Sequence, residues 1–404
     1  MNITQLNYTD LQGRRFNGYD LHLKLNSLDY NSHYKVWTKR GSDKKTDVIA
    51  KFCCHHLIKK LFEKIENILS IQLLIYPFSW LLLFNKEFRK SDLIHFHLIH
   101  NSYFSLLSLP ILTRLKPTVW TLHDPWALTG HCVHPYKCDK WKTLCYKCPY
   151  LENIIPMKND RTKFMYRIKK FIYKHSNFTI VVASNWMKKM VSSSPLMKNK
   201  IVHLIPFGIN LDVFKPQSVS ELKKKLNIPP NNIVIAFRAN PSEFKGMKYI
   251  NTCLQKLNTN QKITILTFDI KGLYDTFNSK YQIVDCGWVN DEKYLAKLLN
   301  IVDIFLMPSM AETFGMMAIE VMACGKPLII FENTALSEIT YAPVGATAVP
   351  YGNSNELIKA VNLLLNNSTK RKMIGGNARK IATKHYDFKN YIKNHIDLYQ
   401  SLVK

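Results

Sequence analysis

Two glutamates set eight positions apart are the residues of this chain whose spacing most clearly suggests chemistry. Glu312 and Glu320 lie in the segment ETFGMMAIEVMACG, with a Phe-Gly pair between them. The apolar run Ile304–Met307 upstream is typical of a strand, and Gly325 is placed to end a helix that Gly315 opens. We therefore expect Glu312 in a loop and Glu320 one to two turns into a helix.

The helix start between these glutamates is suited to binding an anion. The backbone N–H groups of Phe314, Gly315 and Met316 would lack helical acceptors there, and a glycine permits the close approach of a phosphate. In a helix continuous through both glutamates, the carboxylates would stand about 12 Å apart at ~1.5 Å per residue, which is the scale of a nucleoside diphosphate sugar. The alternative is an ordinary solvated helix start with an acidic first turn.

Two cations follow an earlier apolar run in the same half of the chain. Arg238 and Lys245 lie in AFRANPSEFKGMKYI, which we expect to form a loop just beyond the carboxyl end of the strand-like segment Ile233–Phe237. Arginine and lysine placed there can neutralise a diphosphate leaving group as negative charge builds on it. Taken singly, each would be read as an ordinary surface charge.

Short apolar runs alternate with longer segments of helical period along the chain. Several runs are continuously apolar, which is the signature of strands buried on both faces of a parallel sheet. The pattern predicts an α/β protein with two Rossmann-like, doubly wound domains facing each other across a cleft. The expected strands are Met1–Leu6, Tyr34–Thr38, Leu93–Leu98, Thr118–Leu122, Phe178–Ala183, Ile233–Phe237, Ile263–Thr267, Ile283–Asp285, Ile304–Met307 and Leu328–Phe331.

The boundary between the two domains is expected in IPFGINLDVFKPQS, residues 205–218, where two prolines and a glycine punctuate the chain. We expect an N-terminal domain over 1–205 and a C-terminal domain over 206–385. The final helical segment, 386–404, is expected to cross back onto the first domain. The linker would then act as a hinge over a ligand cleft.

The EX7E segment with its inner Phe-Gly pair, preceded by MPSMAE and followed by VMACGKPLI, resembles the retaining family 4 glycosyltransferases of GT-B architecture. The Arg238 and Lys245 segment, PFGINLDVFKP and DCGWVNDEKYLAKLLNIVDIFLMPS extend the resemblance over nearly all of residues 200–385. The resemblance implies a nucleotide-sugar donor held mainly by the second domain. It also implies metal-independent transfer of a hexose-type sugar with retention, without a cofactor.

Roles for individual residues follow from the same resemblance. Glu320 would bind the ribose hydroxyls and Glu312 the donor sugar. Ser309 and residues 314–316 would lie near the phosphates and the sugar, with Arg238 and Lys245 acting on the leaving diphosphate.

The first half adds a histidine and a glycine to the expected site. His123 lies in VWTLHDPWALTGHC, where the family places a histidine that reaches the donor sugar. A lone histidine at a strand end would otherwise be structural. The glycine pair that the family carries near the N-terminus is not intact in DLQGRRFNGYDL, which leaves Gly13 as the candidate for close backbone approach to the donor or acceptor.

Four cysteines cluster in a loop expected over residues 131–149. Cys132, Cys138, Cys145 and Cys148 have a spacing that permits a structural zinc site, with His131 and His134 as substitute ligands; plain reduced thiols are the alternative. The surrounding HDPWALTGHC…CP insertion resembles a bacterial subgroup that makes capsular, O-antigen or exopolysaccharide chains. The acceptor would then be a glycan or a lipid-linked oligosaccharide.

The formal net charge is +27, of which +19 falls in residues 1–200 and +8 in residues 201–404. The charge implies an anionic partner, and the lysine-rich amphipathic segment 55–76 suggests that this partner is an anionic membrane surface. The simpler alternatives are a solvated lysine-rich surface for the charge and a helix packed on its own sheet for the segment.

The N-terminus has no pattern of a secretion signal, so we expect a cytoplasmic protein at the inner face of the membrane. Residues 68–84 are read as a buried helix, because Gln72 and Pro77 interrupt the only run that approaches membrane length.

Two other functions fit parts of the sequence. A sugar-nucleotide epimerase of the same two-domain shape would need acid and base groups at a sugar carbon, which the EX7E segment with its cations does not suggest. A basic, non-catalytic module that binds membrane or nucleic acid, with a zinc-like cysteine cluster, would leave both glutamates without a use. We therefore expect no nucleic-acid partner.

Overall fold

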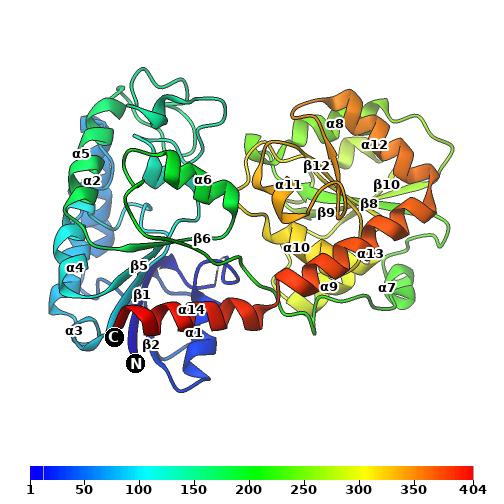
Figure 1. Ribbon diagram of the computed structural model, residues 1–404. Helices are drawn as coiled ribbons and strands as arrows, with labels where there is room; N and C mark the ends of the chain where they lie inside the picture. The colour runs from blue at the N-terminus through cyan, green and yellow to red at the C-terminus, as the bar shows by residue number, and fades with distance from the viewer. Residues whose placement is uncertain (12, 404) are drawn as a thin grey trace. The chain divides into compact units, whose positions relative to one another are not determined.

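The chain forms two compact units, each built on a parallel sheet covered by helices (Figure 1). The computed structural model describes residues 1–11 and 13–403. The first unit comprises Met1–Pro206 together with the chain from Tyr391 onward, and the second comprises Phe207–Asn390. Each unit has its own hydrophobic core.

The sheet of the first unit has the strand order β3-β2-β1-β4-β5-β6-β7, and all its pairings are parallel. The central strands β4, β5 and β6 are buried along their whole length, as expected where helices cover both faces of a sheet. The strands are β1 (Asn2–Thr9), β2 (Asn31–Thr38), β3 (Thr46–Val48), β4 (Leu93–Phe96), β5 (Thr118–Thr121), β6 (Thr179–Val182) and β7 (Val202–Leu204).

The sheet of the second unit has the order β10-β9-β8-β11-β12-β13, again with parallel pairing throughout. The strands are β8 (Ile233–Ala239), β9 (Ile263–Asp269), β10 (Gln282–Asp285), β11 (Ile304–Met307), β12 (Leu328–Phe331) and β13 (Thr347–Val349). The predicted α/β class with two doubly wound sheets is therefore confirmed.

Helices connect the strands and cover the sheets. In the first unit they are α1 (Tyr19–Asn26), α2 (His55–Leu69), α3 (Lys86–Lys90), α4 (Leu109–Leu115), α5 (Thr162–Lys174) and α6 (Asn185–Ser193), with 3-10 turns η1 (Phe78–Phe84), η2 (Leu106–Ser108), η3 (Pro125–Leu128) and η4 (Lys140–Lys142). From α7 onward they are α7 (Ser220–Lys225), α8 (Met247–Lys256), α9 (Glu292–Ile301), α10 (Met316–Ala323), α11 (Ala335–Ile339), α12 (Ser354–Asn366), α13 (Ser368–His385) and α14 (Phe388–Val403), with η5 (Glu243–Lys245) and η6 (Asp275–Phe277).

All ten predicted strands are present, with ends that differ by a few residues. The sequence analysis missed β3, β7 and β13, each of which has three residues and lies at or near a sheet edge. Runs this short carry too little apolar pattern to be recognised.

The prediction of one buried helix over residues 68–84 is wrong. Helix α2 ends at Leu69, and the chain then turns onto the buried carboxylate of Glu66, which accepts the backbone N–H groups of Leu73, Leu74 and Ile75 at 2.8, 2.8 and 3.2 Å. A helix continuing past Leu69 could not offer these three consecutive N–H groups to one side chain. Among the helices in the described ranges, none has the length and apolar character needed to cross a membrane.

The last helix, α14, completes the first unit from Tyr391 onward. The hydroxyl of Tyr399 lies 2.6 Å from Nδ1 of His95 on β4, and both side chains are buried. The far end of the chain is therefore fixed to a central strand by a polar contact inside the core.

We expect Tyr399→Phe to lower the free energy of unfolding of the first unit by about 1–2 kcal/mol, because a buried histidine nitrogen loses its partner. Urea unfolding followed by a probe in that unit would measure the effect. Tyr30→Phe is the matched control, since the Tyr30 hydroxyl receives an exposed bond from Gln400 at 3.2 Å. Equal, near-zero effects for the two variants would contradict this account of the core.

Candidate active site

The loops that carry the expected site residues leave the carboxyl ends of neighbouring strands. In each sheet the strand order reverses once, between β1 and β4 in the first unit and between β8 and β11 in the second. Open α/β sheets bind ligands beyond the carboxyl ends of the strands at such a point. Lys245 lies in the loop after β8, and Ser309 and Glu312 lie in the loop after β11.

Lys245 and Glu312 form an ion pair at this point of the second unit. Nζ of Lys245 lies 2.5 Å from Oε1 of Glu312, and Oγ of Ser309 lies 3.4 Å from the same oxygen. Both charged side chains are largely but not fully buried. The pair therefore offers a cation and a carboxylate side by side, one suited to a phosphate and the other to sugar hydroxyls.

Backbone contacts between the loops hold this pair in place. The N–H of Met310 donates to the carbonyl of Phe244 at 2.8 Å, which joins the loop after β11 to the loop after β8. The hydroxyl of Tyr351 donates to the carbonyl of Met310 at 2.8 Å, and the N–H of Ala335 donates to the carbonyl of Glu312 at 3.2 Å. The charged side chains thus stand on a frame made by several strand ends.

Helix α10 begins where the sequence predicts it. Gly315 precedes the helix with a φ of 98°, and a Cβ at this position would lie 2.5 Å from Cδ2 of Leu336. The positive φ favours glycine here, and any larger residue would also displace the end of the Leu336 side chain. The ring of Phe314 is buried in an edge-on contact with Phe207, so contacts from Phe314 to a ligand would come from its backbone.

Glu320 lies inside the second unit with no exposed surface. It belongs to the run Ala318–Ala323, every residue of which is buried. Glu312 lies ahead of the helix start, so the two glutamates do not share one continuous helix.

Arg238 lies within β8 rather than in the loop after it, as was expected, because pairing with β9 extends this strand to Ala239. Nη2 of Arg238 lies 2.6 Å from Oδ2 of Asp269, which also accepts a bond from Nδ2 of Asn240 at 2.8 Å. Asp269 ends β9, the neighbour of β8, and has a left-handed φ of 90°. The sequence analysis missed Asp269, although a carboxylate at the end of the run ITILTFD was a usable signal.

His123 follows β5 in the first unit and is held by other aromatic side chains. Its Nε2 lies 3.3 Å from Nδ1 of His97, and the ring of Phe16 meets it edge-on with centroids 5.7 Å apart. Phe16 belongs to the loop that contains Gly13, so the structure brings the predicted glycine loop beside the predicted histidine. Burial lowers the pKa of His123 to about 3, which keeps the imidazole neutral at neutral pH.

The loop after His123 is fixed by groups that the sequence analysis missed. Asp124 accepts the N–H of Trp126 at 2.9 Å and pairs with Nε2 of His100 at 3.1 Å. Nζ of the buried Lys169 donates to the carbonyls of Trp126 and Thr129 at 2.8 and 3.0 Å and lies 3.4 Å from the centroid of the Trp126 ring. Burial lowers the pKa of Lys169 to about 7. A lysine in an amphipathic helix gives no sequence sign of such a role.

The four clustered cysteines carry free thiols. A hydrogen bond with Cys132 lowers the pKa of Cys148 to about 7, and Sγ of Cys145 accepts the N–H of Gly130 at 3.2 Å. Nε2 of His131 lies 2.9 Å from the carbonyl of Leu151. Across residues 1–11 and 13–403, no group of three or more His, Cys, Asp or Glu side chains is arranged to hold a metal ion. Structural zinc thus stays a prediction from the spacing of the cysteines alone.

Two family matches cover most of the chain. Residues 46–213 match the family described as Glycosyltransferase Family 4, and residues 218–381 match Glycosyl transferases group 1. The second match contains Arg238, Lys245 and the Glu312–Glu320 segment, and the first contains His123.

Curated relatives are similar at low identity. A putative colanic acid biosynthesis glycosyl transferase, WcaC of Escherichia coli, is 24% identical over 286 residues, which is 67% of this chain and 66% of the relative. An N,N'-diacetylbacillosaminyl-diphospho-undecaprenol alpha-1,3-N-acetylgalactosaminyltransferase of Campylobacter jejuni is 26% identical over 286 residues, covering 66% of this chain and 73% of the relative.

A solved structure repeats the architecture over the whole chain. Anabaena Alr3699/HepE in complex with UDP and glucose aligns with a TM-score of 0.68 and 16% identity, covering 100% of each chain. At this identity the likeness concerns the fold. Together with the two family matches and the two parallel sheets, it places the chain in the group 1, family 4 glycosyltransferases of GT-B fold.

Proposed function

We propose that the protein transfers a hexose-type sugar, with retention, from a nucleotide-sugar donor to a glycan acceptor that is lipid-linked, in the synthesis of a bacterial surface polysaccharide. The observation that carries this proposal is the Lys245–Glu312 pair at the point where the second sheet reverses its strand order. Beside it, the start of α10 offers backbone N–H groups to an anion.

The proposed roles follow from the chemistry of each group. Lys245 stabilises the negative charge that develops on the departing diphosphate, and Glu312 binds hydroxyls of the donor sugar. Arg238 assists Lys245, since a guanidinium has five N–H donors and the bond to Asp269 orients it without using them all. Buried Glu320 would bind the ribose hydroxyls, and neutral His123 would contact the sugar.

We infer that transfer needs no metal cofactor, because Arg238 and Lys245, in β8 and in the loop after it, supply cations that can balance the charge of a diphosphate. The transition state of glycosyl transfer resembles an oxocarbenium ion. Retention would follow if the acceptor attacks from the face that the diphosphate leaves, with the departing phosphate taking the acceptor proton.

The names of the relatives support the proposed substrates. The Campylobacter relative is named for a diphospho-undecaprenol acceptor, and the Escherichia coli relative for colanic acid synthesis. The Anabaena structure contains UDP. A nucleotide donor and a lipid-linked acceptor are therefore the substrates we propose here.

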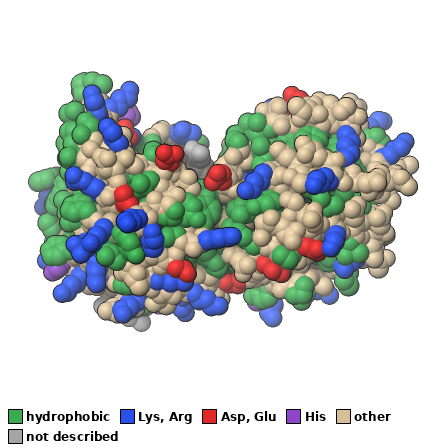
Figure 2. All heavy atoms as spheres, turned by 90° about the horizontal axis from the view of Figure 1, so that it is seen from above, with side chains coloured by type: hydrophobic (Ala, Val, Ile, Leu, Met, Phe, Trp, Pro, Cys, Tyr) green, Lys and Arg blue, Asp and Glu red, His purple; other side chains and the backbone are tan. Residues whose placement is uncertain are grey.

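We also propose that the first unit binds an anionic membrane surface from the cytoplasmic side through α2. Leu57, Leu61 and Ile68 on this helix are more than half exposed, and Lys60 and Lys64 lie among them. Phe84 at the end of η1 is 80% exposed. Figure 2 shows Lys and Arg side chains interspersed with hydrophobic ones on the face of the first unit turned to the viewer. Exposed apolar groups flanked by lysines suit shallow insertion into anionic lipid.

We expect Glu312→Gln and Lys245→Met each to lower kcat by about 10²–10³-fold, because each removes a charge that acts on the transition state. Initial rates of sugar transfer, with the unfolding midpoint as a check on folding, would measure this. The exposed pair Glu356 and Lys359 in α12, with Nζ and Oε1 2.7 Å apart, supplies the matched controls Glu356→Gln and Lys359→Met. Turnover at the wild-type rate in either site variant would refute the proposed site.

A thermal-shift screen against UDP-, GDP-, dTDP- and ADP-sugars tests the donor class. We expect one nucleotide family to raise the midpoint, since a ligand at a hundred times its Kd adds about 2.7 kcal/mol to the native state. The wild-type protein should prefer the ribonucleoside diphosphate of the matching base over its 2′,3′-dideoxy form, and Glu320→Gln should lose that preference. Strong binding to anionic lipid or nucleic acid without any response to sugar nucleotides would instead favour a non-catalytic basic module.

Sedimentation with vesicles of phosphatidylglycerol and phosphatidylcholine tests membrane binding. We expect the double variant Leu57→Gln/Leu61→Gln to bind about tenfold more weakly or worse, because it loses the burial of two leucines, worth at least ~1.5 kcal/mol in total. Leu115→Gln/Leu363→Gln is the control, since these leucines are 55% and 43% exposed outside α2. Equal binding by both double variants would exclude α2 as the membrane contact.

A further inference from the structure

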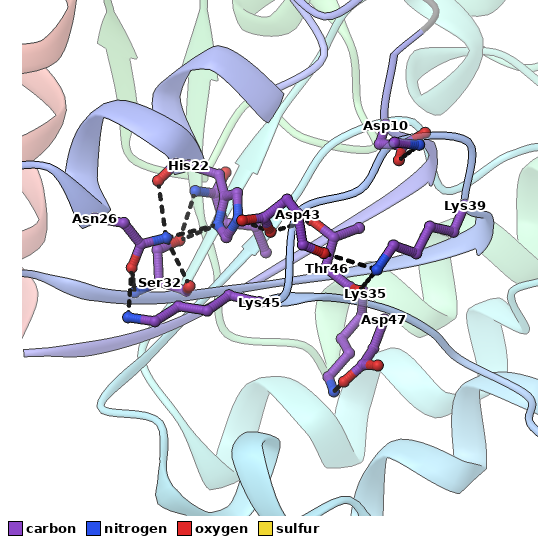
Figure 3. Close-up of polar contacts among 12 residues, drawn as sticks. Asp10, His22, Asn26, Ser32, Lys35, Lys39, Asp43, Lys45, Thr46 and Asp47 are labelled. Carbon is purple, nitrogen blue, oxygen red and sulfur yellow. Dashed lines mark hydrogen bonds and ion pairs between the residues drawn. The ribbon is translucent and has the colours of Figure 1, made fainter.

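A line of hydrogen bonds begins at Asp43, in the first unit, and runs inward. Oδ2 of Asp43 lies 3.1 Å from Nε2 of His22 and accepts the hydroxyl of Thr46 at 2.8 Å. Nδ1 of His22 lies 2.9 Å from Oγ of Ser32. Figure 3 shows these side chains pointing toward one another between α1 and the strand β2. His22 and Ser32 have no exposed surface, while Asp43 keeps part of its side chain in contact with solvent.

The same line continues from Ser32 to His123. Nε2 of Gln5 on β1 donates to Oγ of Ser32 at 3.1 Å, and Oε1 of Gln5 lies 3.0 Å from Nε2 of His97. Nδ1 of His97 lies 3.3 Å from Nε2 of His123. A Cβ on Gly18 would lie 2.1 Å from Nε2 of His97, so the ring fits only because residue 18 has no side chain.

The direction of every bond is fixed by the carboxylate at the outer end. Burial favours the neutral acid, but hydrogen bonds from Thr46 and His22 leave the pKa of Asp43 below its ordinary value, so the group is ionised and can only accept. Burial lowers the pKa of His22 despite its contact with Asp43, so its ring is neutral. Nε2 of His22 must therefore carry the proton and Nδ1 the lone pair, and Ser32 donates its hydroxyl to that lone pair.

The same reasoning sets the inner half of the line. The Ser32 oxygen accepts from the Gln5 amide, so the Gln5 carbonyl faces His97 and accepts a proton from its Nε2. Burial holds the pKa of His97 well below its ordinary value, which leaves Nδ1 of this neutral ring as an acceptor. Nε2 of His123 must then donate to it, and the lone pair of His123 lies on Nδ1.

We propose that these five side chains act as a positioning chain that fixes the tautomer and the orientation of His123, so that Nδ1 can accept, but not donate, a hydrogen bond. The chain comprises Asp43, His22, Ser32, Gln5 and His97. The inference rests on the proposed function in one respect, namely that His123 contacts the donor sugar. In that case its partner on the sugar is a hydroxyl that donates its proton to Nδ1.

A neighbouring histidine does not belong to this chain. The ring of His95 packs at a tilt against His97 with centroids 4.0 Å apart, but its ring nitrogens lie 2.6 Å from the Tyr399 hydroxyl and 2.7 Å from Oγ1 of Thr121. It packs against the chain without joining its line of donors and acceptors. Substitutions at Ser32 and Asp43 therefore act on His123 without touching the contact between α14 and the sheet.

The test uses the full-length protein labelled with ¹⁵N in histidine. Long-range ¹H–¹⁵N spectra distinguish protonated from unprotonated ring nitrogens, and His123→Gln assigns the signals of His123. The variants are Ser32→Ala, which removes the middle of the chain, and Asp43→Ala, which removes its partly exposed anchor. Ser108→Ala and Asp47→Ala are controls, because Ser108 is a buried serine bonded to Ser79 and Asp47 pairs with Lys35, both outside the chain.

We expect wild-type His123 to be protonated at Nε2 alone, and to show a mixture of tautomers in Ser32→Ala and Asp43→Ala. With a donor identified, kcat should fall about tenfold in both, the equivalent of one ordinary hydrogen bond, with KM for the donor little changed. Ser32→Thr, which keeps a hydroxyl, should restore the wild-type tautomer and rate.

Two results would overturn the proposal: His123 protonated at Nδ1 in the wild-type protein, or an unchanged tautomer in both chain variants. The spectra need no turnover, so they decide the proposal even if the protein transfers no sugar. Full activity of His123→Gln would instead reject the role of His123 in transfer and leave the tautomer result standing.

Discussion

Parallel pairing brings the loops that carry the candidate site residues to one edge of each sheet. Every strand of a parallel sheet points the same way, so the segments after β8 and β11 leave the second sheet side by side where the strand order reverses. Lys245 and Glu312 are 67 positions apart in the chain, yet their charged atoms lie 2.5 Å from each other because of this constraint. The contacts that hold their loops, such as Met310 to Phe244, arise from the same convergence.

Burial of polar groups follows different rules in the two units. The second unit keeps charges at its strand ends in pairs, with Lys245 beside Glu312 and Arg238 beside Asp269. In the first unit the imidazoles of His97 and His123, which follow β4 and β5, are neutral because desolvation disfavours the imidazolium form, although Asp124 next to them pairs with His100. Ionic partners can neutralise a developing charge, whereas neutral rings hold donors and acceptors in a fixed arrangement.

The sequence predicted the fold and the principal loops well because these depend on local pattern. Continuous apolar runs mark strands buried on both faces. Gly315 and Gly325 mark the start and the end of the helix that follows one of these strands. Asp269, Lys169 and the set of groups around His97 could not be found in the same way. Their partners come from elements distant in the chain, as with Gln5 and His97, which are 92 positions apart.

The wrong prediction of a helix over residues 68–84 also arose from a polar contact that the sequence does not reveal. An apolar composition predicts burial, but the buried carboxylate of Glu66 binds the backbone that turns after α2. Glu66 is one of two glutamates in this lysine-rich helix, and nothing in the sequence sets it apart from Glu63. Short edge strands escaped notice because three residues cannot establish a period. Pattern therefore identified which segments pack, while the partners of individual polar groups required the three-dimensional arrangement.

The position of α14 has a consequence for the order in which the protein can form during synthesis. Most domains made first can fold first, as soon as they leave the ribosome. Here the core beside β4 lacks Tyr399, and the surface that α14 covers stays open until the whole of the second unit has been made. The unit that starts the chain is therefore the one that finishes last, and the second unit is free to fold while the first still awaits its final helix.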